Sequence, residues 1–361
     1  MPDSRPLRVL LVKTSSMGDV VQALPVVQDI LHHRPGSRIE WMLEPGYADL
    51  VRQHPGVERA IAVPWREWRR RPLAAQTRAQ WRELRADLAA RHFDAVIDLQ
   101  GLCKSAILAR LAQGTRYGWK GRACREPLAA CLYDRRMSAP PFDTLSAVLR
   151  YRMLCAWALG YAVQGEPVYG LRPTAVRPEG LPGRAPFAVL LSATARDEKL
   201  WPEDAWANLG IQLRERGLAL VLAWGSDIER ARAQRIAERV LAAVADPAAA
   251  PVVVAPRRLG LLEWAQAFAA ASLVVGVDTG LSFLAAAVQC PVVGVYTATS
   301  PLHVGIQASS PHRNLGEIGR APSSAQVLQA ALDMLAQRGP TDTAAGPAAG
   351  PATGPATGGR A

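Results

Sequence analysis

The chain has 361 residues, of which 49% are hydrophobic and 20% charged, a length and composition that favour two ordinary globular domains over one. Its 42 lysine and arginine residues outnumber 31 acidic residues and give a formal net charge of +11, which favours an anionic partner: nucleic acid, a membrane surface or a phosphorylated substrate. The five cysteines lack metal-site spacing and no apolar run is long enough to span a membrane, so we expect reduced thiols, a cytoplasmic protein and at most peripheral membrane contact.

The first part of the chain alternates short apolar runs, which are typical of buried strands, with segments of helical periodicity. A polar loop with a single glycine, residues 13–19, joins the first strand to the first helix, as at the start of many doubly wound folds. Because this loop lacks the G-x-G-x-x-G pattern, we expect no nicotinamide dinucleotide site there. The pattern predicts strands at residues 7–12, 38–43, 60–63 and 94–99, and helices at residues 20–33, 74–91, 104–112 and 145–159.

A basic and aromatic cluster, Trp-Arg-Glu-Trp-Arg-Arg-Arg, occupies residues 65–71. Arg66, Arg69 and Arg70 are candidates for binding phosphates or carboxylates, because a guanidinium holds either group with paired hydrogen bonds. Each of them can equally be ordinary surface charge. Nucleic acid is a weaker alternative, since the chain shows none of the usual nucleic-acid-binding motifs.

A segment rich in proline and glycine, residues 166–186, is interpreted as a linker between two domains, residues 1–165 and 187–323. Because strands and helices alternate on both sides of it, we predict an α/β protein with two parallel-sheet domains facing one cleft. A last helix, residues 324–338, and a low-complexity tail, residues 339–361, follow, and we expect the tail to be disordered. The later strands are predicted at residues 187–191, 218–223, 251–255, 273–277 and 291–296, and the later helices at residues 203–216, 226–243 and 261–271.

One strand–turn–helix stretch, residues 273–288, has the features of a phosphate cradle. The turn Asp-Thr-Gly precedes a helix whose first N–H groups have no helical acceptor and carry partial positive charge. Gly280 allows ligand oxygens to approach the backbone, and Thr279 and Ser282 can add hydroxyl donors. The alternative is that Asp278 or Thr279 merely caps the helix. These residues alone leave both interpretations open.

Six short motifs follow one another along the chain: residues 12–20, 98–105 (Asp-Leu-Gln-Gly-Leu-Cys-Lys-Ser), 125–128 (Arg-Glu-Pro-Leu), 196–202 (Arg-Asp-Glu-Lys-Leu-Trp-Pro), 224–225 (Trp-Gly) and 277–282 (Val-Asp-Thr-Gly-Leu-Ser). Together and in this order they resemble glycosyltransferase family 9, the heptosyltransferases of lipopolysaccharide synthesis. Within the first motif, the loop Lys-Thr-Ser-Ser-Met-Gly-Asp looks like the heptosyltransferase I branch rather than heptosyltransferase II.

The resemblance implies a GT-B fold, two Rossmann-like domains around a central cleft, and transfer with inversion. The family moves L-glycero-D-manno-heptose from ADP-heptose to a Kdo sugar of Kdo-lipid A, at the cytoplasmic face of the bacterial inner membrane. A formal charge of +11 suits an acceptor that bears carboxylates and phosphates. We expect no cofactor and, since the chain holds no Asp-x-Asp pair, no essential metal.

The resemblance also assigns roles to individual residues. Asp19 matches the proposed general base, with an N-cap of the following helix as the alternative. Lys199 matches the lysine that contacts the donor diphosphate, with a solvated loop lysine as the alternative. Glu229 matches a ribose contact, but it also completes a capping box with Ser226. The donor set is Thr194, Lys199, Glu229, Asp278, Thr279, Gly280, Leu281 and Ser282, and the acceptor set is Ser15, Ser16, Gly18, Arg66, Arg69, Arg70, Gln100, Lys104 and Arg125.

One position departs from the family pattern, because Phe283 stands where the family commonly has histidine. The exchange removes a hydrogen-bond donor near the diphosphate and bears on the strength of donor binding. The alternatives are a related heptosyltransferase (II or III) with another acceptor, and a non-catalytic protein that binds a sugar nucleotide or lipid A. Asp19 and Lys199 argue against a mere binding protein.

Overall fold

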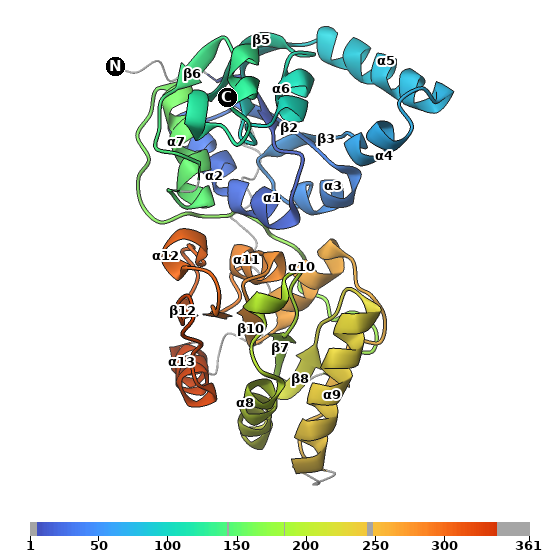
Figure 1. Ribbon diagram of the computed structural model, residues 1–361, viewed down its shortest axis with the longest axis vertical. Coiled ribbons are helices and arrows are strands. Elements are labelled where there is room, and N and C mark those ends of the chain that lie inside the picture. The colour runs from blue at the N-terminus through green and yellow to red at the C-terminus, as the bar shows by residue number, and fades with distance from the viewer. Residues whose placement is uncertain (1–5, 143, 184, 244–247, 338–361) are drawn as a thin grey trace, which may run out of the picture.

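The computed structural model describes residues 6–142, 144–183, 185–243 and 248–337 (Figure 1). It contains two six-stranded sheets whose strands run in the orders β3-β2-β1-β4-β5-β6 and β12-β11-β10-β7-β8-β9. Every strand pair is parallel. Counted from its own first strand, each sheet has the order 3-2-1-4-5-6 of a doubly wound fold. The predicted α/β class with two parallel sheets is therefore confirmed.

The first half of the molecule carries the first sheet and lies at the top of Figure 1. Its elements are β1 (Arg8–Val12), α1 (Met17–Ala23), α2 (Pro25–His33), β2 (Arg38–Leu43), α3 (Pro45–Val51), β3 (Val57–Ala62), α4 (Trp65–Arg70), α5 (Ala75–Ala89), β4 (His92–Asp98), α6 (Cys103–Ala109), β5 (Gln113–Trp119), the 3₁₀ helices η1 (Gly121–Ala123) and η2 (Pro127–Leu132), β6 (Arg135–Met137) and α7 (Ala147–Leu159).

The second half carries the second sheet and lies below the first in Figure 1. Its elements are β7 (Phe187–Leu191), the 3₁₀ helix η3 (Asp197–Lys199), α8 (Glu203–Glu215), β8 (Ala219–Leu222), α9 (Asp227–Ala243), β9 (Val252–Val254), α10 (Leu261–Ala270), β10 (Leu273–Val277), α11 (Gly280–Ala287), β11 (Val292–Val295), α12 (Pro301–Val304), β12 (His312–Leu315) and α13 (Ser324–Gln337).

Two sequence predictions need correction and one falls outside the described residues. The helix predicted at residues 20–33 is two helices, because Pro25, at the first position of α2, has no backbone N–H to continue α1. Strands β5, β6 and β12 were not predicted, because none of them has an apolar run: β5 contains two glycines and polar residues, and the edge strands β6 and β12 are short and polar. The tail predicted at residues 339–361 lies outside the described residues.

The strand register places the site-bearing loops at one end of each sheet. In the first sheet Val12 pairs with Asp98, so the loops after β1 and β4 leave the same edge. In the second, Gly276 pairs with Leu191, which brings together the loops after β7 and β10. Helix α1 packs against α11 and α3 against α10, so these edges face each other across the two halves (Figure 1). Among the described residues no helix combines the length and the apolar character needed to cross a bilayer.

Candidate active site

A cavity of about 540 Å³ lies between the two halves and is lined by residues from both. Nine residues of the predicted site line it: Ser16, Gly18, Asp19, Arg125, Thr194, Lys199, Asp278, Thr279 and Gly280. The other lining residues are Gln22, Phe142, Leu145, Ala147, Arg150, Tyr151, Ala195, Phe283, His303 and Val304. The proposed base and the proposed diphosphate-binding lysine, 180 positions apart in the sequence, thus share one cavity.

Asp19 lies in the first turn of α1, at the third helical position, so the N-cap alternative is wrong: Ser16 is the N-cap. One carboxylate oxygen, Oδ2, accepts hydrogen bonds from the Ser16 backbone N–H at 3.0 Å and from the Ser16 hydroxyl at 2.8 Å. The other, Oδ1, accepts one from the Tyr151 hydroxyl at 2.9 Å. These bonds fix the carboxylate at the cavity wall, with its side chain 20% exposed.

Lys13 is a buried cation behind Asp19, and sequence analysis gave it no role. Its Nζ lies 3.7 Å from Oδ1 of Asp19 and 4.9 Å from the centre of the Tyr151 ring. Burial lowers the pKa of Lys13 to about 8, against the opposing attraction of Asp19 and Asp98. For Asp19, burial favours the neutral acid, but Lys13 and the hydrogen bonds outweigh it, so the pKa of Asp19 lies below its ordinary value. Asp19 is consequently ionised at neutral pH.

The loop before α1 is held from behind by the segment that follows β4. The Gln100 side-chain oxygen accepts hydrogen bonds from the Thr14 backbone N–H at 2.8 Å and its hydroxyl at 2.7 Å. The Ser15 hydroxyl accepts bonds from Gln100 at 3.4 Å and from the Lys104 ammonium at 3.2 Å. Gln100 is buried and does not line the cavity, so the structure places this predicted acceptor residue in support of the loop.

Lys199 and Asp278 form an ion pair on the opposite wall, with Nζ 2.5 Å from Oδ2. The Thr299 hydroxyl donates to the same carboxylate oxygen at 2.9 Å, and the Thr194 hydroxyl donates to the Asp278 carbonyl at 3.0 Å. Asp278 is thus tied to three neighbouring segments. Because an ammonium can contact several oxygens at once, Lys199 can remain on this carboxylate and still bind an anion in the cavity.

Thr279 caps α11, as the capping alternative states, but its side chain makes no capping hydrogen bond. Thr279 is the N-cap and Gly280 the first helical residue, and both line the cavity. Their position turns the positive end of the helix toward the cavity. Ser282 is different, because its buried hydroxyl donates to the Val277 carbonyl at 2.9 Å and is engaged with the backbone. Leu281 is partly buried and does not line the cavity, so its backbone N–H is the group available to a ligand.

Two glycines bring α1 and α11 into backbone contact. A Cβ added to Gly18 would lie 3.3 Å from Cα of Gly280, and a Cβ added to Gly280 would lie 3.1 Å from the Gly18 nitrogen and 2.5 Å from Cε of Met17. Phe283 packs beside this contact, since its Cδ2 would lie 3.5 Å from the same added Cβ of Gly18. Phe283 lines the cavity, yet only 6% of its surface is exposed.

Glu229 forms the capping interaction that sequence analysis offered as the alternative to ribose binding. Its Oε2 accepts a hydrogen bond from the Gly225 backbone N–H at 2.6 Å, and its own backbone N–H donates to the Ser226 hydroxyl at 3.3 Å. It does not line the 540 Å³ cavity. The carboxylate is partly exposed, so its second oxygen is available to a ligand.

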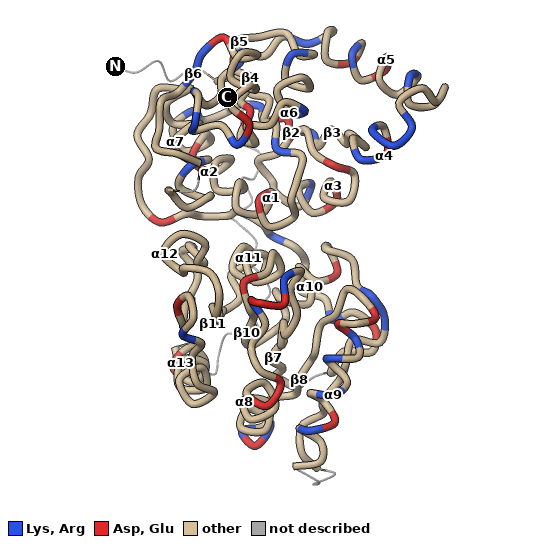
Figure 2. The backbone as a smooth tube through the Cα atoms, in the orientation of Figure 1, with Lys and Arg blue, Asp and Glu red and all other residues tan. Residues whose placement is uncertain are grey.

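The three predicted acceptor arginines of the basic cluster lie on α4, outside the cavity. Figure 2 shows the basic residues of α4 at the side of the first half, near α3. Arg66 lies 3.9 Å from Glu44, and the positive charges of Arg66 and Arg69 add to burial in lowering the pKa of Lys104. Lys104 in turn donates to Ser15. A line of positive charge therefore connects α4 to the loop that carries Asp19.

No cluster of three or more histidine, cysteine, aspartate or glutamate side chains suited to a metal ion occurs in the part of the chain that the structure describes. The model described as glycosyltransferase family 9 (heptosyltransferase) matches residues 81–328. The chain belongs to glycosyltransferase family 9. Lipopolysaccharide heptosyltransferase 1 of Escherichia coli strain K12 is 40% identical over 304 residues, which cover 83% of this chain and 90% of that protein.

Solved structures of this glycosyltransferase family share the whole fold. The Escherichia coli heptosyltransferase WaaC with ADP is 37% identical to this chain and superposes with a TM-score of 0.78. The match covers 91% of this chain and 100% of WaaC. WaaC with ADP-2-deoxy-2-fluoro heptose gives a TM-score of 0.73 at 37% identity, covering 92% of this chain and 99% of that one. The GT-B fold expected for a family 9 glycosyltransferase is therefore confirmed.

In this family 9 enzyme most of the residues that the sequence did not indicate hold one of the two carboxylates in place, and Arg150 lines the cavity itself. Lys13 and Tyr151 hold the Asp19 carboxylate, and Thr299 holds that of Asp278. Arg150 lines the cavity with its guanidinium 4.6 Å from the centre of the Phe142 ring. The sequence offered one signal for Arg150 and Tyr151. They belong to the stretch Leu-Arg-Tyr-Arg-Met at residues 149–153, in which polar residues lie between apolar ones in a predicted helix.

Proposed function

We propose that the enzyme transfers L-glycero-D-manno-heptose, with inversion, from ADP-heptose to a Kdo residue of Kdo-lipid A in lipopolysaccharide inner-core synthesis. The observation that carries the proposal is the single cavity in which Asp19 of one half faces Lys199 and the start of α11 of the other. The similarity to lipopolysaccharide heptosyltransferase 1 and to WaaC with an ADP-heptose analogue supports the donor.

The chemistry follows from the opposed walls. Asp19, ionised by its neighbours, accepts the proton of the acceptor hydroxyl as that oxygen bonds to the anomeric carbon. The bond from that carbon to the ADP oxygen breaks on the other side, which inverts the configuration. Lys199 and the backbone N–H groups of Gly280 and Leu281 stabilise the charge that develops on the departing diphosphate. Thr194 holds the turn before α11, because its hydroxyl donates to the Asp278 carbonyl.

The acceptor is assigned to the first half. Ser16, Gly18 and Arg125 line the cavity beside Asp19, where a Kdo sugar and its carboxylate would bind. Lys104 and the α4 residues Arg66, Arg69 and Arg70 extend positive charge away from this point and would bind the phosphates of lipid A. Ser15 and Gln100 keep the loop in place. Glu229 is assigned to the donor ribose through its free oxygen.

We place the enzyme at the cytoplasmic face of the bacterial inner membrane, in peripheral contact with anionic lipid and without a nucleic-acid partner or cofactor. A net charge of +11 and a lipid-linked acceptor support this location. The proposed functional units are an acceptor domain (residues 1–165), a linker (166–186) and a donor domain (187–323), followed by a terminal helix (324–338).

The proposal is tested by measuring ADP release from ADP-heptose with and without Kdo-lipid A. We expect release that depends on the acceptor and a product heavier by one heptose. Acceptor-dependent release only with a heptosylated core would instead indicate a heptosyltransferase II or III activity. Tight ADP-heptose binding with no turnover on either acceptor would indicate a binding protein.

A further inference from the structure

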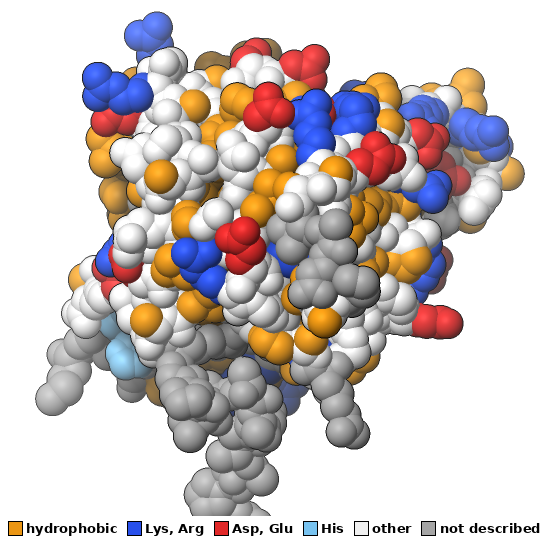
Figure 3. Space-filling model, turned by 90° about the horizontal axis from the view of Figure 1, so that it is seen from below, with side chains coloured by type: hydrophobic (Ala, Val, Ile, Leu, Met, Phe, Trp, Pro, Cys, Tyr) orange, Lys and Arg blue, Asp and Glu red, His pale blue; other side chains and the backbone are white. Residues whose placement is uncertain are grey.

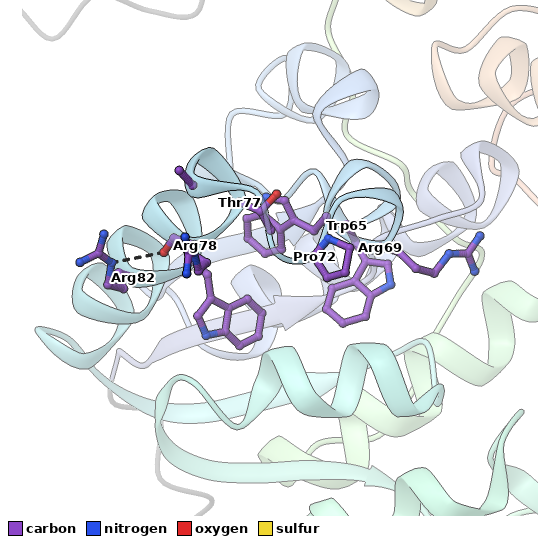
Figure 4. A pocket seen from close by; sticks show the side chains of 9 residues that line it. Trp65, Arg69, Pro72, Thr77, Arg78 and Arg82 are labelled. Atoms are coloured by element: carbon purple, nitrogen blue, oxygen red, sulfur yellow. Dashed lines mark hydrogen bonds between the residues drawn. The ribbon is translucent and has the colours of Figure 1, made fainter.

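A second cavity, of about 920 Å³, lies in the first half between α4 and α5 (Figure 4). Its apolar lining includes the side chains of Trp65, Trp68 and Trp81. The rings of Trp68 and Trp81 meet edge to face, with centroids 5.5 Å apart. We call this cavity the tryptophan groove. It is separate from the site between the halves, because the two cavities share no lining residue.

The tryptophan groove continues onto an exposed apolar turn. Leu73, in the turn between α4 and α5, is 83% exposed, and Ala75 at the start of α5 is exposed as well as lining the groove. Figure 1 shows α4 and α5 projecting from the side of the first half, away from the second. Trp65 and Trp81 are half-buried, whereas Trp68 is buried with 5% of its surface exposed. Leu73 and the accessible parts of the two half-buried rings form the kind of exposed apolar surface that marks an interaction site.

Unpaired positive charge surrounds the groove. Figure 4 shows Arg78 and Arg82 on one side, from α5, and Arg69 on the other, from α4. Residues 65–91 contain eight arginines and three acidic residues. Among the described residues no carboxylate lies within 4 Å of the charged groups of Arg69, Arg78 or Arg82. The rim therefore attracts anions.

At the opposite end of the molecule, by contrast, arginines form ion pairs with carboxylates. On α9 the arginines Arg232, Arg235 and Arg239 all pair with Glu203 of α8. Seen from that end, acidic and basic side chains lie interspersed (Figure 3). The combination of an apolar floor with an uncompensated basic rim is thus a property of the α4–α5 surface.

We propose that the tryptophan groove is a membrane-docking surface that binds an anionic phospholipid bilayer. Indole rings favour the interface between lipid headgroups and acyl chains, where the apolar body is buried and the N–H stays near polar groups. The groove takes an acyl chain of a bilayer lipid, and Arg78 and Arg82 bind lipid phosphates. The proposal deepens the proposed function by naming the surface that meets the membrane, and its test contains no sugar acceptor.

The test uses two variants of α5 that carry the same added charge. Ala75→Glu places a carboxylate in the groove at the first helical position, where an acidic residue suits the helix dipole. Ala79→Glu places it on an exposed part of α5 outside the groove. Binding of the full-length enzyme is measured by flotation with vesicles of phosphatidylglycerol and phosphatidylethanolamine, and folding of each variant by thermal melting.

We expect vesicle binding by the wild type, a loss of at least about tenfold for Ala75→Glu, and a change of less than about twofold for Ala79→Glu. Equal binding by the two variants, or no binding by the wild type, would overturn the proposal without affecting ADP-heptose turnover. An increase in KM for Kdo-lipid A in Ala75→Glu with unchanged vesicle binding would also overturn it, because the groove would then hold the acceptor's own acyl chain.

A second pair of variants tests the basic rim. Arg78→Gln with Arg82→Gln removes two charges from the groove, whereas Arg135→Gln with Arg136→Gln removes two exposed charges from β6. We expect the first pair to weaken binding to vesicles rich in phosphatidylglycerol and to reduce its salt dependence. The same loss in both pairs would show that net charge alone drives binding and would contradict a localised docking surface.

Discussion

Asp19 combines burial with four favourable contacts, from Lys13, Tyr151 and both donors of Ser16. We expect Asp19→Asn to keep these neighbours in place and to preserve the fold and ADP-heptose binding, because an amide has nearly the same shape. Loss of the proton acceptor should lower kcat by about two to four decades. The test is steady-state kinetics on a variant whose melting temperature is unchanged. Near-normal turnover would show that Asp19 is not the general base.

Lys13 sets the charge state of Asp19, so its removal should change the pH profile. The ammonium lowers the pKa of Asp19, and Lys13→Met should therefore raise it. Because the base acts when ionised, the acidic limb of the kcat–pH profile should move to higher pH. Lys120→Met, at an exposed position, is the control and should leave the profile in place. An unchanged acidic limb in Lys13→Met would show that Asp19 is not the group that titrates.

The same substitution should change how stability depends on pH. The pKa of Lys13 is about 8 in the folded protein against an ordinary value of 10.5, so the unfolded chain binds more protons between these two pH values. Stability contributed by this residue therefore rises with pH across that window. Denaturant unfolding from pH 7.5 to pH 10.5 should show less of this rise in Lys13→Met than in the wild type, and identical slopes would contradict the lowered pKa.

Phe283 lies at the cavity and is also packed between the halves. We expect Phe283→His to fold and to bind ADP-heptose equally well or more tightly, because it adds a donor where a charged hydrogen bond is worth roughly 1.5–3 kcal/mol. Phe283→Leu, which adds no donor, is the matched control. Thermal melting and ADP titration separate the outcomes. A large fall in melting temperature without a gain in ADP affinity would show that the ring serves packing alone.

At the level of elements, helix α4 carries the arginines proposed to bind the acceptor, and it lies outside the cavity that holds Asp19 and Lys199. Replacing Arg66, Arg69 and Arg70 by glutamine should raise KM for Kdo-lipid A and leave the affinity for ADP-heptose unchanged, because none of the three lines the cavity that holds the donor residues. The control replaces the exposed Lys120, Arg135 and Arg136 by glutamine. A fall in the affinity of the α4 variant for ADP-heptose would contradict the assignment of the acceptor to this helix.

The elements themselves show how far the sequence predicts the structure. Apolar runs with β-branched residues predict the inner strands other than β5, since burial on both faces favours such runs. The break between α1 and α2 depends on one proline inside a pattern that otherwise reads as continuous helix. Tyr151 could not be assigned to Asp19, because the two are 132 positions apart and only the packing of α7 on α1 brings them together. Sequence motifs thus indicate which loops form the site, while the groups that orient the charges follow from tertiary packing.

For the molecule as a whole, the site exists only while the two sheets face each other. The proposed base belongs to the first half, and the proposed leaving-group stabilisers belong to the second. Neither half alone would hold both walls of the cavity. Length and composition predict two domains. They do not predict the distance between the two walls of the cavity, because that distance depends on how the domains pack against each other.

The contact between Gly18 and Gly280 has a mechanical consequence. In any rotation of one rigid body against another, points near the axis move least. If the halves swing about this backbone contact, Asp19, one position from Gly18, and the start of α11 stay nearly at rest, while the outer rim of the cleft travels furthest. The entrance can then widen for a bulky glycolipid while the reacting groups keep their spacing. Because neither glycine has a side chain, the two backbones can touch and pivot here, whereas a larger residue at either position would force them apart.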